Sequence, residues 1–121
     1  MQPRTQRPVR VYIRDHLAAD QISENVRILI DMREAGRLTL DQEHTASVIP
    51  VELSAPGAHS YVLEVKSVFR KERGHPEQRE YVGQGTFTAR TDKVFRLAAD
   101  RTGNGMRVRL EADEDEQEID E

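Results

Sequence analysis

Histidines, serines and charged side chains are the residues of this chain that could do chemistry. The four histidines, at positions 16, 44, 59 and 75, are too far apart for the HxH and HExxH spacings that hold a metal. The tightest group of acids with a histidine is Asp41, Glu43 and His44. We expect this group to be an exposed polar strand end, with weak metal binding as the alternative.

Nucleophilic catalysis needs an activated serine or cysteine, and the sequence carries no signature for one. The chain has no cysteine, and none of its serines lies in a GxSxG turn. The stretch Gly83-Gln-Gly85 lacks the later glycine and the following helix of a dinucleotide-binding loop. We therefore expect a protein that is not an enzyme, with no cofactor, no metal and no small-molecule substrate.

Charge is distributed unevenly along the 121 residues, whose formal net charge is −4. Residues 113–121 contain seven of the 22 acidic residues and no basic one, so the other 112 residues carry 18 basic and 15 acidic side chains. A run of like charges repels itself and has no apolar face to bury, so we expect a disordered acidic tail. Its role is open between a solubility segment, a latch over the basic body and a docking strip for a basic partner.

Arginines occupy the polar positions of two apolar alternations. Arg10 and Arg14 lie on one face of the first predicted strand, and Arg107 and Arg109 lie on one face of the last. We take these four as the candidate partner-binding residues. If the two strands are neighbours, the arginines form a basic stripe, but the small surplus of positive charge disfavours a nucleic-acid partner.

Alternation of apolar and polar residues, which is the pattern of a half-buried strand, recurs along the body of the chain. It predicts strands over residues 9–14, 25–33, 38–40, 48–53, 61–70, 81–89, 94–98 and 106–110. Pro50 marks its strand as an edge or a bulge, because proline lacks the donor that a central strand needs. Gly83 and Gly85 indicate a bulge or the close approach of another backbone.

Residues 25–33 also fit a helical stripe that begins at Ile22. The strand template instead places four apolar residues, from Val26 to Met32, on one face, and we favour it. A short helical turn near residues 17–23 remains an alternative.

Seven to eight short strands with turn signals between them predict an all-β protein. A strand with one apolar face must bury that face against another sheet, so we expect a single antiparallel β-sandwich of the immunoglobulin-like type. We expect a flexible N-terminal arm at residues 1–7, the sandwich domain at residues 8–112 and the acidic tail at residues 113–121. The candidate sheet edges are the first strand and the strand that contains Pro50.

Five stretches between residues 60 and 112 carry a resemblance to a known family. They are Tyr61-Val-Leu63-Glu-Val65, the loop around Gly74, Gly83-Gln-Gly85-Thr-Phe87, Val94-Phe-Arg-Leu97 and Met106-Arg-Val108-Arg-Leu110. In this order they resemble the curli-assembly inhibitor family, small immunoglobulin-like sandwiches of the bacterial periplasm that hold back amyloid subunits. The resemblance implies a chaperone-like protein whose arginine-bearing strand faces meet acidic or polar amyloid precursors, while the tail keeps the complex soluble.

The leading hypothesis is thus a non-catalytic β-sandwich that binds a protein partner, with a sheet edge that can accept a partner strand. The first alternative is a structural or decoration subunit of a phage or other particle, which would self-associate. The second alternative is a nucleic-acid-binding module screened by its acidic tail. No apolar run approaches the roughly 20 residues of a membrane helix. We expect a cytoplasmic location if Met1 is the native start, and a periplasmic one if the chain is a processed form.

Overall fold

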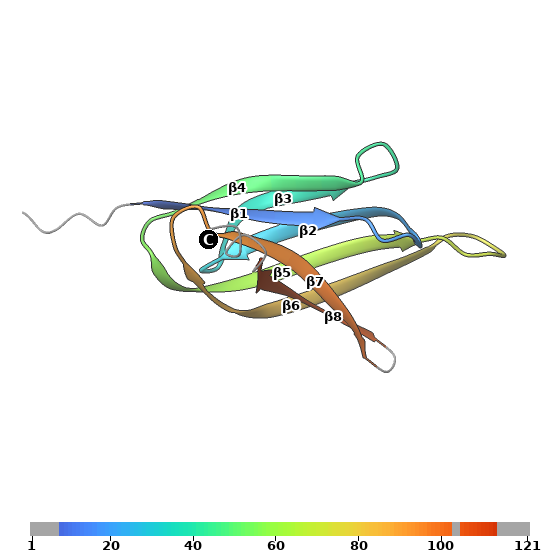
Figure 1. Cartoon of the computed structure of the whole chain (residues 1–121). Helices are drawn as coiled ribbons and strands as arrows, with labels where there is room; N and C mark the ends of the chain where they lie inside the picture. The colour runs from blue at the N-terminus through green and yellow to red at the C-terminus, as the bar shows by residue number, and fades with distance from the viewer. Residues whose placement is uncertain (1–7, 103–104, 114–121) are drawn as a thin grey trace, which may run out of the picture.

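Eight β-strands make up the residues that the structure, a computed structural model, describes: 8–102 and 105–113 (Figure 1). Their bounds are β1 Val9–His16, β2 Gln21–Ile30, β3 Arg33–Leu40, β4 Ala46–Leu53, β5 Gly57–Phe69, β6 Glu77–Ala89, β7 Val94–Thr102 and β8 Gly105–Ala112. These residues include no helix long and apolar enough to cross a membrane. The described residues form strands and connecting turns and no helix, so the predicted all-β class is confirmed.

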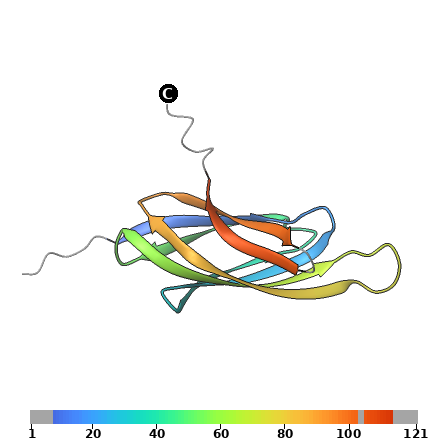
Figure 2. The same cartoon turned by 90° about the horizontal axis from the view of Figure 1, so that it is seen from below.

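The strands form two four-stranded sheets that lie against each other in a sandwich-like arrangement (Figures 1 and 2). Sheet A has the strand order β4-β1-β7-β8, and sheet B has the order β3-β2-β5-β6. Neighbouring strands are antiparallel except β1 and β7, which are parallel and pair only where Tyr12 to Arg14 lie opposite Val94 to Arg96. The expectation of wholly antiparallel sheets is wrong at this pair.

The core lies between the two sheets, because the apolar side chains of each strand recur at every second position. Ile13, Ile28 and Leu63 show the result, since each is fully buried in the middle of its strand. The buried apolar residues of the core are Val9, Val11, Ile13, Val26, Ile28, Ile30, Leu38, Val51, Leu53, Tyr61, Leu63, Val65, Phe87, Ala89, Phe95, Leu97, Val108 and Leu110. Each strand therefore leaves its other, mostly polar side on the outside of the molecule.

Residues 21–30 form strand β2, so the strand reading of this region is right and the helical one is wrong. The residues before it form a turn, which also excludes a helical turn near residues 17–23. The strand ends earlier than predicted. Asp31 and Met32 have positive φ angles of 52° and 71° and form the two-residue turn to β3, and this turn leaves Met32 exposed rather than in the core.

Gly83 allows β6 of sheet B to approach β8 of sheet A. A Cβ atom at Gly83 would lie 2.0 Å from the carbonyl oxygen of Val108, so no larger residue fits there without moving a backbone. Tyr61 closes the same side of the sandwich, because the Leu110 N–H donates to its hydroxyl oxygen at 3.1 Å. The close backbone approach predicted at Gly83 is confirmed, and β8 is a covered edge.

Of the two strands predicted to be sheet edges, one is an edge and the other is not. The strand with Pro50 is β4, and it is an edge of sheet A as expected. The first strand, β1, is not an edge, because it lies between β4 and β7. The alternation of its side chains predicted only which face is buried, and the neighbours on either side depend on the rest of the fold.

The chain ends predicted from composition fall mostly outside the described residues. These are the N-terminal arm at residues 1–7 and residues 114–121 of the acidic tail. Asp113, the first residue assigned to the tail, is described: its side chain is buried, and its N–H donates to the Val94 carbonyl oxygen at 2.9 Å. This residue is thus attached to sheet A.

Candidate functional site

The four arginines selected from the sequence lie on the outer face of sheet A, but in two separate places. Arg10 and Arg14 extend from β1, Arg107 and Arg109 extend from β8, and β7 runs between the two strands. Because β1 and β8 are not neighbours, they do not form the predicted stripe. Arg96 of β7 lies in register with Arg14, so the intervening strand contributes an arginine of its own.

Carboxylates neutralise most of these arginines. The ion pairs are Arg10 with Glu52 at 2.6 Å, Arg14 with Asp113 at 2.5 Å, Arg109 with Glu111 at 2.7 Å, Arg109 with Asp100, and Arg96 with Glu111. The hydrogen bond from Arg109 is the main reason that the pKa of Glu111 is lowered. Arg107 is exposed and forms no ion pair within the described part of the chain. This face therefore presents alternating charges, which do not favour binding to a polyanion.

Strand β4 turns part of its backbone away from sheet A. The Tyr12 N–H donates to the Lys93 carbonyl oxygen at 2.9 Å, and the Arg10 carbonyl oxygen accepts the Asp92 N–H at 2.7 Å. Even-numbered residues of β1 thus direct their backbone groups toward β7, and odd-numbered ones direct theirs toward β4. Since odd residues of β1 lie opposite odd residues of β4, the even residues of β4 have backbone groups that point outward.

The outward positions of β4 include Val48, Pro50 and Glu52, and all three side chains are exposed. Within the described residues β4 pairs with β1 alone, so this row of groups has no strand beside it. Pro50 interrupts the row because it has no N–H, which is where proline is tolerated in a sheet. Chemically, the edge offers carbonyl acceptors at each position and N–H donors on either side of Pro50.

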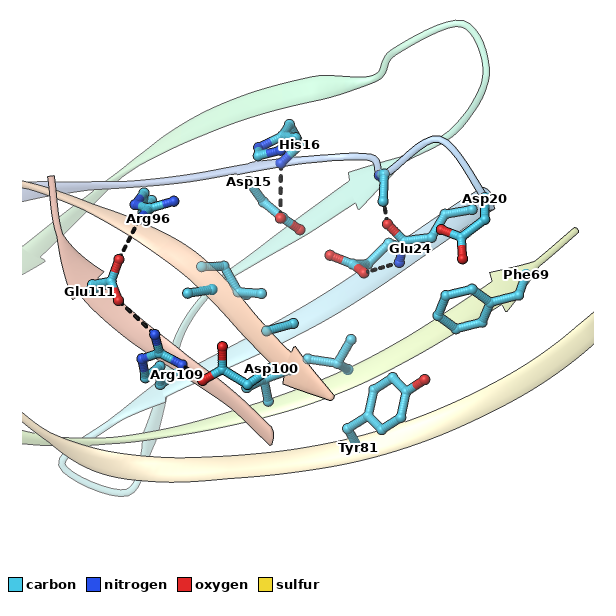
Figure 3. A pocket seen from close by; sticks show the side chains of 17 residues that line it. Asp15, His16, Asp20, Glu24, Phe69, Tyr81, Arg96, Asp100, Arg109 and Glu111 are labelled. Atoms are coloured by element: carbon cyan, nitrogen blue, oxygen red, sulfur yellow. Dashed lines mark hydrogen bonds and ion pairs between the residues drawn. The ribbon is translucent and has the colours of Figure 1, made fainter. Parts of the chain in front are cut away.

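A cavity of about 400 Å³ opens where β1 and β7 part. Their pairing stops at Arg14 and Arg96, and beyond that point β1 continues beside β4 while β7 continues beside β8. Figure 3 looks into this cavity, whose far wall comes from sheet B and includes Glu24, Phe69 and Tyr81. The separation of two strands thus brings interior polar groups next to a space that a ligand can enter.

Two buried carboxyl groups line this cavity and point toward each other, Asp15 from β1 and Glu24 from β2 (Figure 3). Asp15 is 5% exposed and Glu24 is 6% exposed. Glu24 Oε1 accepts hydrogen bonds from Gln21 Nε2 at 2.6 Å and from Ser67 Oγ at 2.9 Å. Asp15 Oδ1 accepts the N–H of His16 at 2.8 Å, whereas Asp15 Oδ2 accepts no hydrogen bond within the described residues.

The position of Asp15 changes its acidity. Burial is the largest cause, followed by the hydrogen bond and the charge of Glu24, and together they raise the pKa of Asp15 to about 9. Near neutral pH the Asp15 carboxyl group therefore keeps its proton, and Oδ2 is the oxygen placed to carry it toward Glu24. The pair, named here the carboxyl pair, can store a proton, release it, and accept hydrogen bonds from a donor in the cavity.

Sequence reasoning missed the carboxyl pair, although each strand contains a signal for it. Asp15 continues the inward alternation of Val11 and Ile13, and Glu24 opens the alternation that leads to Val26 and Ile28. An acid at an inward position of such a series indicates a buried carboxyl group. The sequence does not indicate that the two acids meet.

A contact between an acid and a histidine lies at the end of β2 opposite the carboxyl pair. His59 Nδ1 is 2.6 Å from Asp31 Oδ2, and His59 Nε2 is 2.8 Å from the Ala55 carbonyl oxygen. Both neighbours are acceptors, so both contacts are hydrogen bonds only when the ring carries two protons. The bond to Asp31 is the main cause that raises the pKa of His59. This group links the β2–β3 turn to the segment before β5.

The group of Asp41, Glu43 and His44 lies in the exposed loop between β3 and β4, not on a strand end. Asp41 Oδ1 accepts the N–H of Glu43 at 2.9 Å and the N–H of His44 at 2.8 Å, so the aspartate caps its own loop. Over residues 8–102 and 105–113, no group of three or more potential ligands is placed to hold a metal ion.

Comparison of the chain with family models, with curated proteins and with solved structures found no match.

Proposed function

We propose that this protein is a non-catalytic β-sandwich module of the immunoglobulin-like type that binds a protein partner by accepting a partner strand beside β4. The observation that carries the proposal is the row of backbone groups that β4 directs outward at Val48, Pro50 and Glu52. An extended segment laid along such a row gains main-chain hydrogen bonds, and pockets for its alternate side chains add specificity.

The contrast with the other edge of sheet A supports this assignment. At β8 an edge N–H, that of Leu110, is bonded to the Tyr61 hydroxyl, and the backbone of Gly83 packs against Val108. At β4, β3 of sheet B packs against Ile49 through Gly36, but no described residue forms a hydrogen bond with the outward backbone groups of the strand. A sandwich whose edge backbone groups are bonded on one side and not on the other has a preferred side for a partner strand.

Pro50 and Glu52 also limit which strand can bind. A partner residue opposite Pro50 finds no donor, and Glu52 on the same row is paired with Arg10 across the sheet. Both features disfavour long, unselective pairing between edges, which is the function of proline and charge at natural sheet edges. The partner is therefore a short segment that tolerates one missing hydrogen bond.

A chaperone-like role follows if the segment comes from an aggregating subunit. Such subunits associate through unpaired strand edges, and a sandwich that pairs with one of them blocks its growth. The resemblance to the curli-assembly inhibitors supports this form of the proposal, with Arg107, which is exposed and forms no ion pair in the described part of the chain, as the arginine best placed to meet acidic or polar precursors. The acidic residues 113–121 then contribute to the solubility of the complex.

Two substitutions of one residue test the strand-addition mechanism. Val48→Pro removes an outward N–H and leaves the pairing with β1 intact, whereas Val48→Ala keeps the N–H and shortens the side chain. The probe is the fibrillation of a curli-type amyloid subunit followed by thioflavin T fluorescence. We expect the wild-type protein and Val48→Ala to delay fibrillation, and Val48→Pro to lose about tenfold or more in potency, because a lost main-chain hydrogen bond and the added ring both oppose pairing.

Light scattering separates this proposal from the structural-subunit alternative. A monomer that delays fibrillation supports partner binding. A defined oligomer that dissociates in Val48→Pro would instead mean that β4 pairs with a second copy of the chain, as a particle subunit would require. If both variants keep full potency, β4 is not the binding edge.

A further inference from the structure

The cavity between β1 and β7 holds two buried carboxyl groups that no basic side chain neutralises within the described residues. Asp15 and Glu24 form no ion pair there, while the two arginines that also line the cavity, Arg96 and Arg109, are held by Glu111 and Asp100. Asp15 and Glu24 are both buried and face each other across the cavity, so ionisation of this pair places negative charge in the interior of the sandwich. A buried charge without a counterion is unfavourable, so the cavity attracts a cation.

The hydrogen-bonding capacity of the pair indicates which kind of cation fits. Asp15 is nine-tenths buried, and its Oδ2 faces the cavity and accepts no hydrogen bond in the described part of the chain (Figure 3). Glu24 already accepts two hydrogen bonds on Oε1. The pair therefore needs N–H donors rather than a bare ion, and the rings of Phe69 and Tyr81 on the far wall suit an apolar stem attached to them.

We propose that this cavity is a binding site for the primary ammonium group of an alkylamine or of a lysine side chain, which lies between the carboxyl groups of Asp15 and Glu24. The ammonium group donates to Asp15 Oδ2 and to the Glu24 carboxylate, and its alkyl stem lies against Phe69 and Tyr81. The site is separate from the β4 edge and does not depend on the strand-addition mechanism.

Binding at this site releases a proton. Asp15 holds a proton in the free protein and none in the occupied site, so the ammonium ion enters with its three protons and the proton of Asp15 leaves to solvent. Affinity therefore rises with pH by up to about tenfold per unit, until the free pair loses its proton unaided. The other titratable groups that line the cavity are His16 of β1, Asp20 of the β1–β2 turn, Tyr81 of β6, Arg96 and Asp100 of β7, and Arg109 and Glu111 of β8. Sheet B strand β5 contributes only apolar side chains to the lining.

Isothermal titration of the full chain with n-butylamine tests the proposal. Measurement near pH 8 in two buffers of different ionisation enthalpy gives the number of protons released, and we expect a value close to one. Asp15→Asn places a neutral group of the same size in the pair. We expect this variant to release no proton and to lose the rise of affinity with pH, while Glu64→Gln, on the outer face of sheet B, behaves as the wild type.

Three further ligands define the chemistry and the source. Neutral n-butanol and tetramethylammonium, which lacks N–H donors, should each bind at least about tenfold more weakly than butylamine, because neither can replace the proton of Asp15. Nα-acetyl-lysine amide compares a protein side chain with the free amine: tighter binding of this compound assigns the site to a partner's lysine, and tighter binding of butylamine assigns it to a small metabolite. Absence of saturable butylamine binding, or binding that Asp15→Asn leaves unchanged, would overturn the proposal.

Discussion

Replacement of Asp15 by asparagine should make the protein more stable above neutral pH. In the folded protein burial and the neighbouring Glu24 raise the pKa of Asp15 to about 9, whereas the ordinary value is 3.8. The folded state therefore holds a proton that the unfolded chain has lost, and its stability falls as the pH rises through this interval. The asparagine side chain of the variant keeps an acceptor for the His16 N–H and gives Glu24 a permanent donor, so the fold keeps its contacts without binding the proton.

The size of the effect follows from the linked proton. From about pH 5 to pH 8 the folded protein holds close to one extra proton, so its free energy of unfolding falls by about 1.4 kcal/mol per pH unit, or roughly 4 kcal/mol in total. Because other groups titrate in the same range, the relevant quantity is the difference between the wild type and Asp15→Asn. We expect this difference to grow steadily with pH in favour of the variant.

Urea denaturation at several pH values measures that difference, since the linear extrapolation gives the free energy of unfolding at each pH. Glu64→Gln, which removes an exposed carboxylate, serves as the matched control and should run parallel to the wild type. If the difference between the wild type and Asp15→Asn changes by less than about 1 kcal/mol across the range, Asp15 does not hold a proton in the folded protein and the reasoning fails.

Three other predictions concern stability. Gly83→Ala should lower the free energy of unfolding by more than about 2 kcal/mol, because its Cβ would lie 2.0 Å from the Val108 carbonyl oxygen and must displace a backbone, and an unchanged urea midpoint would contradict the close approach. Tyr61→Phe should lower the free energy of unfolding by about 1 to 3 kcal/mol, because it leaves the N–H of Leu110 in β8 buried without an acceptor. Thermal unfolding measures this loss of stability. The bond between His59 and Asp31 raises the pKa of His59 and lowers the pKa of Asp31. Its contribution to the free energy of unfolding is therefore present between the two folded-state pKa values. That contribution is lost as the pH rises through the pKa of His59 or falls through the pKa of Asp31. His59→Asn should remove the alkaline part of this dependence in the same denaturation series, and an unchanged profile would mean that the ring does not titrate with folding.

Local patterning was enough to establish the all-β class and the buried side of most strands. Strand alternation is a property of neighbouring residues, so Val9, Val11 and Ile13 identify an inward face without any knowledge of the fold. The same holds for Pro50, whose missing donor restricts it to an edge or a bulge, and for Gly83, whose missing side chain indicates a close neighbour. Each of these residues thus predicts a property of its own position: a buried face, a sheet edge or a close neighbour.

Which strands and side chains meet depends on the packing of the whole chain. The alternation of β1 is compatible with either an edge or a central position in a sheet. Its central position follows from its pairing with both β4 and β7. Arg10 and Arg107 share the polar faces that the sequence predicts, but β7 separates them. Asp15 and Glu24 each interrupt an apolar series, yet their contact depends on two sheets packing face to face and on β1 leaving β7 after Arg14. Periodicity describes one strand at a time, whereas a buried carboxyl pair or a cavity requires groups that are brought together across the sandwich by the packing of all eight strands.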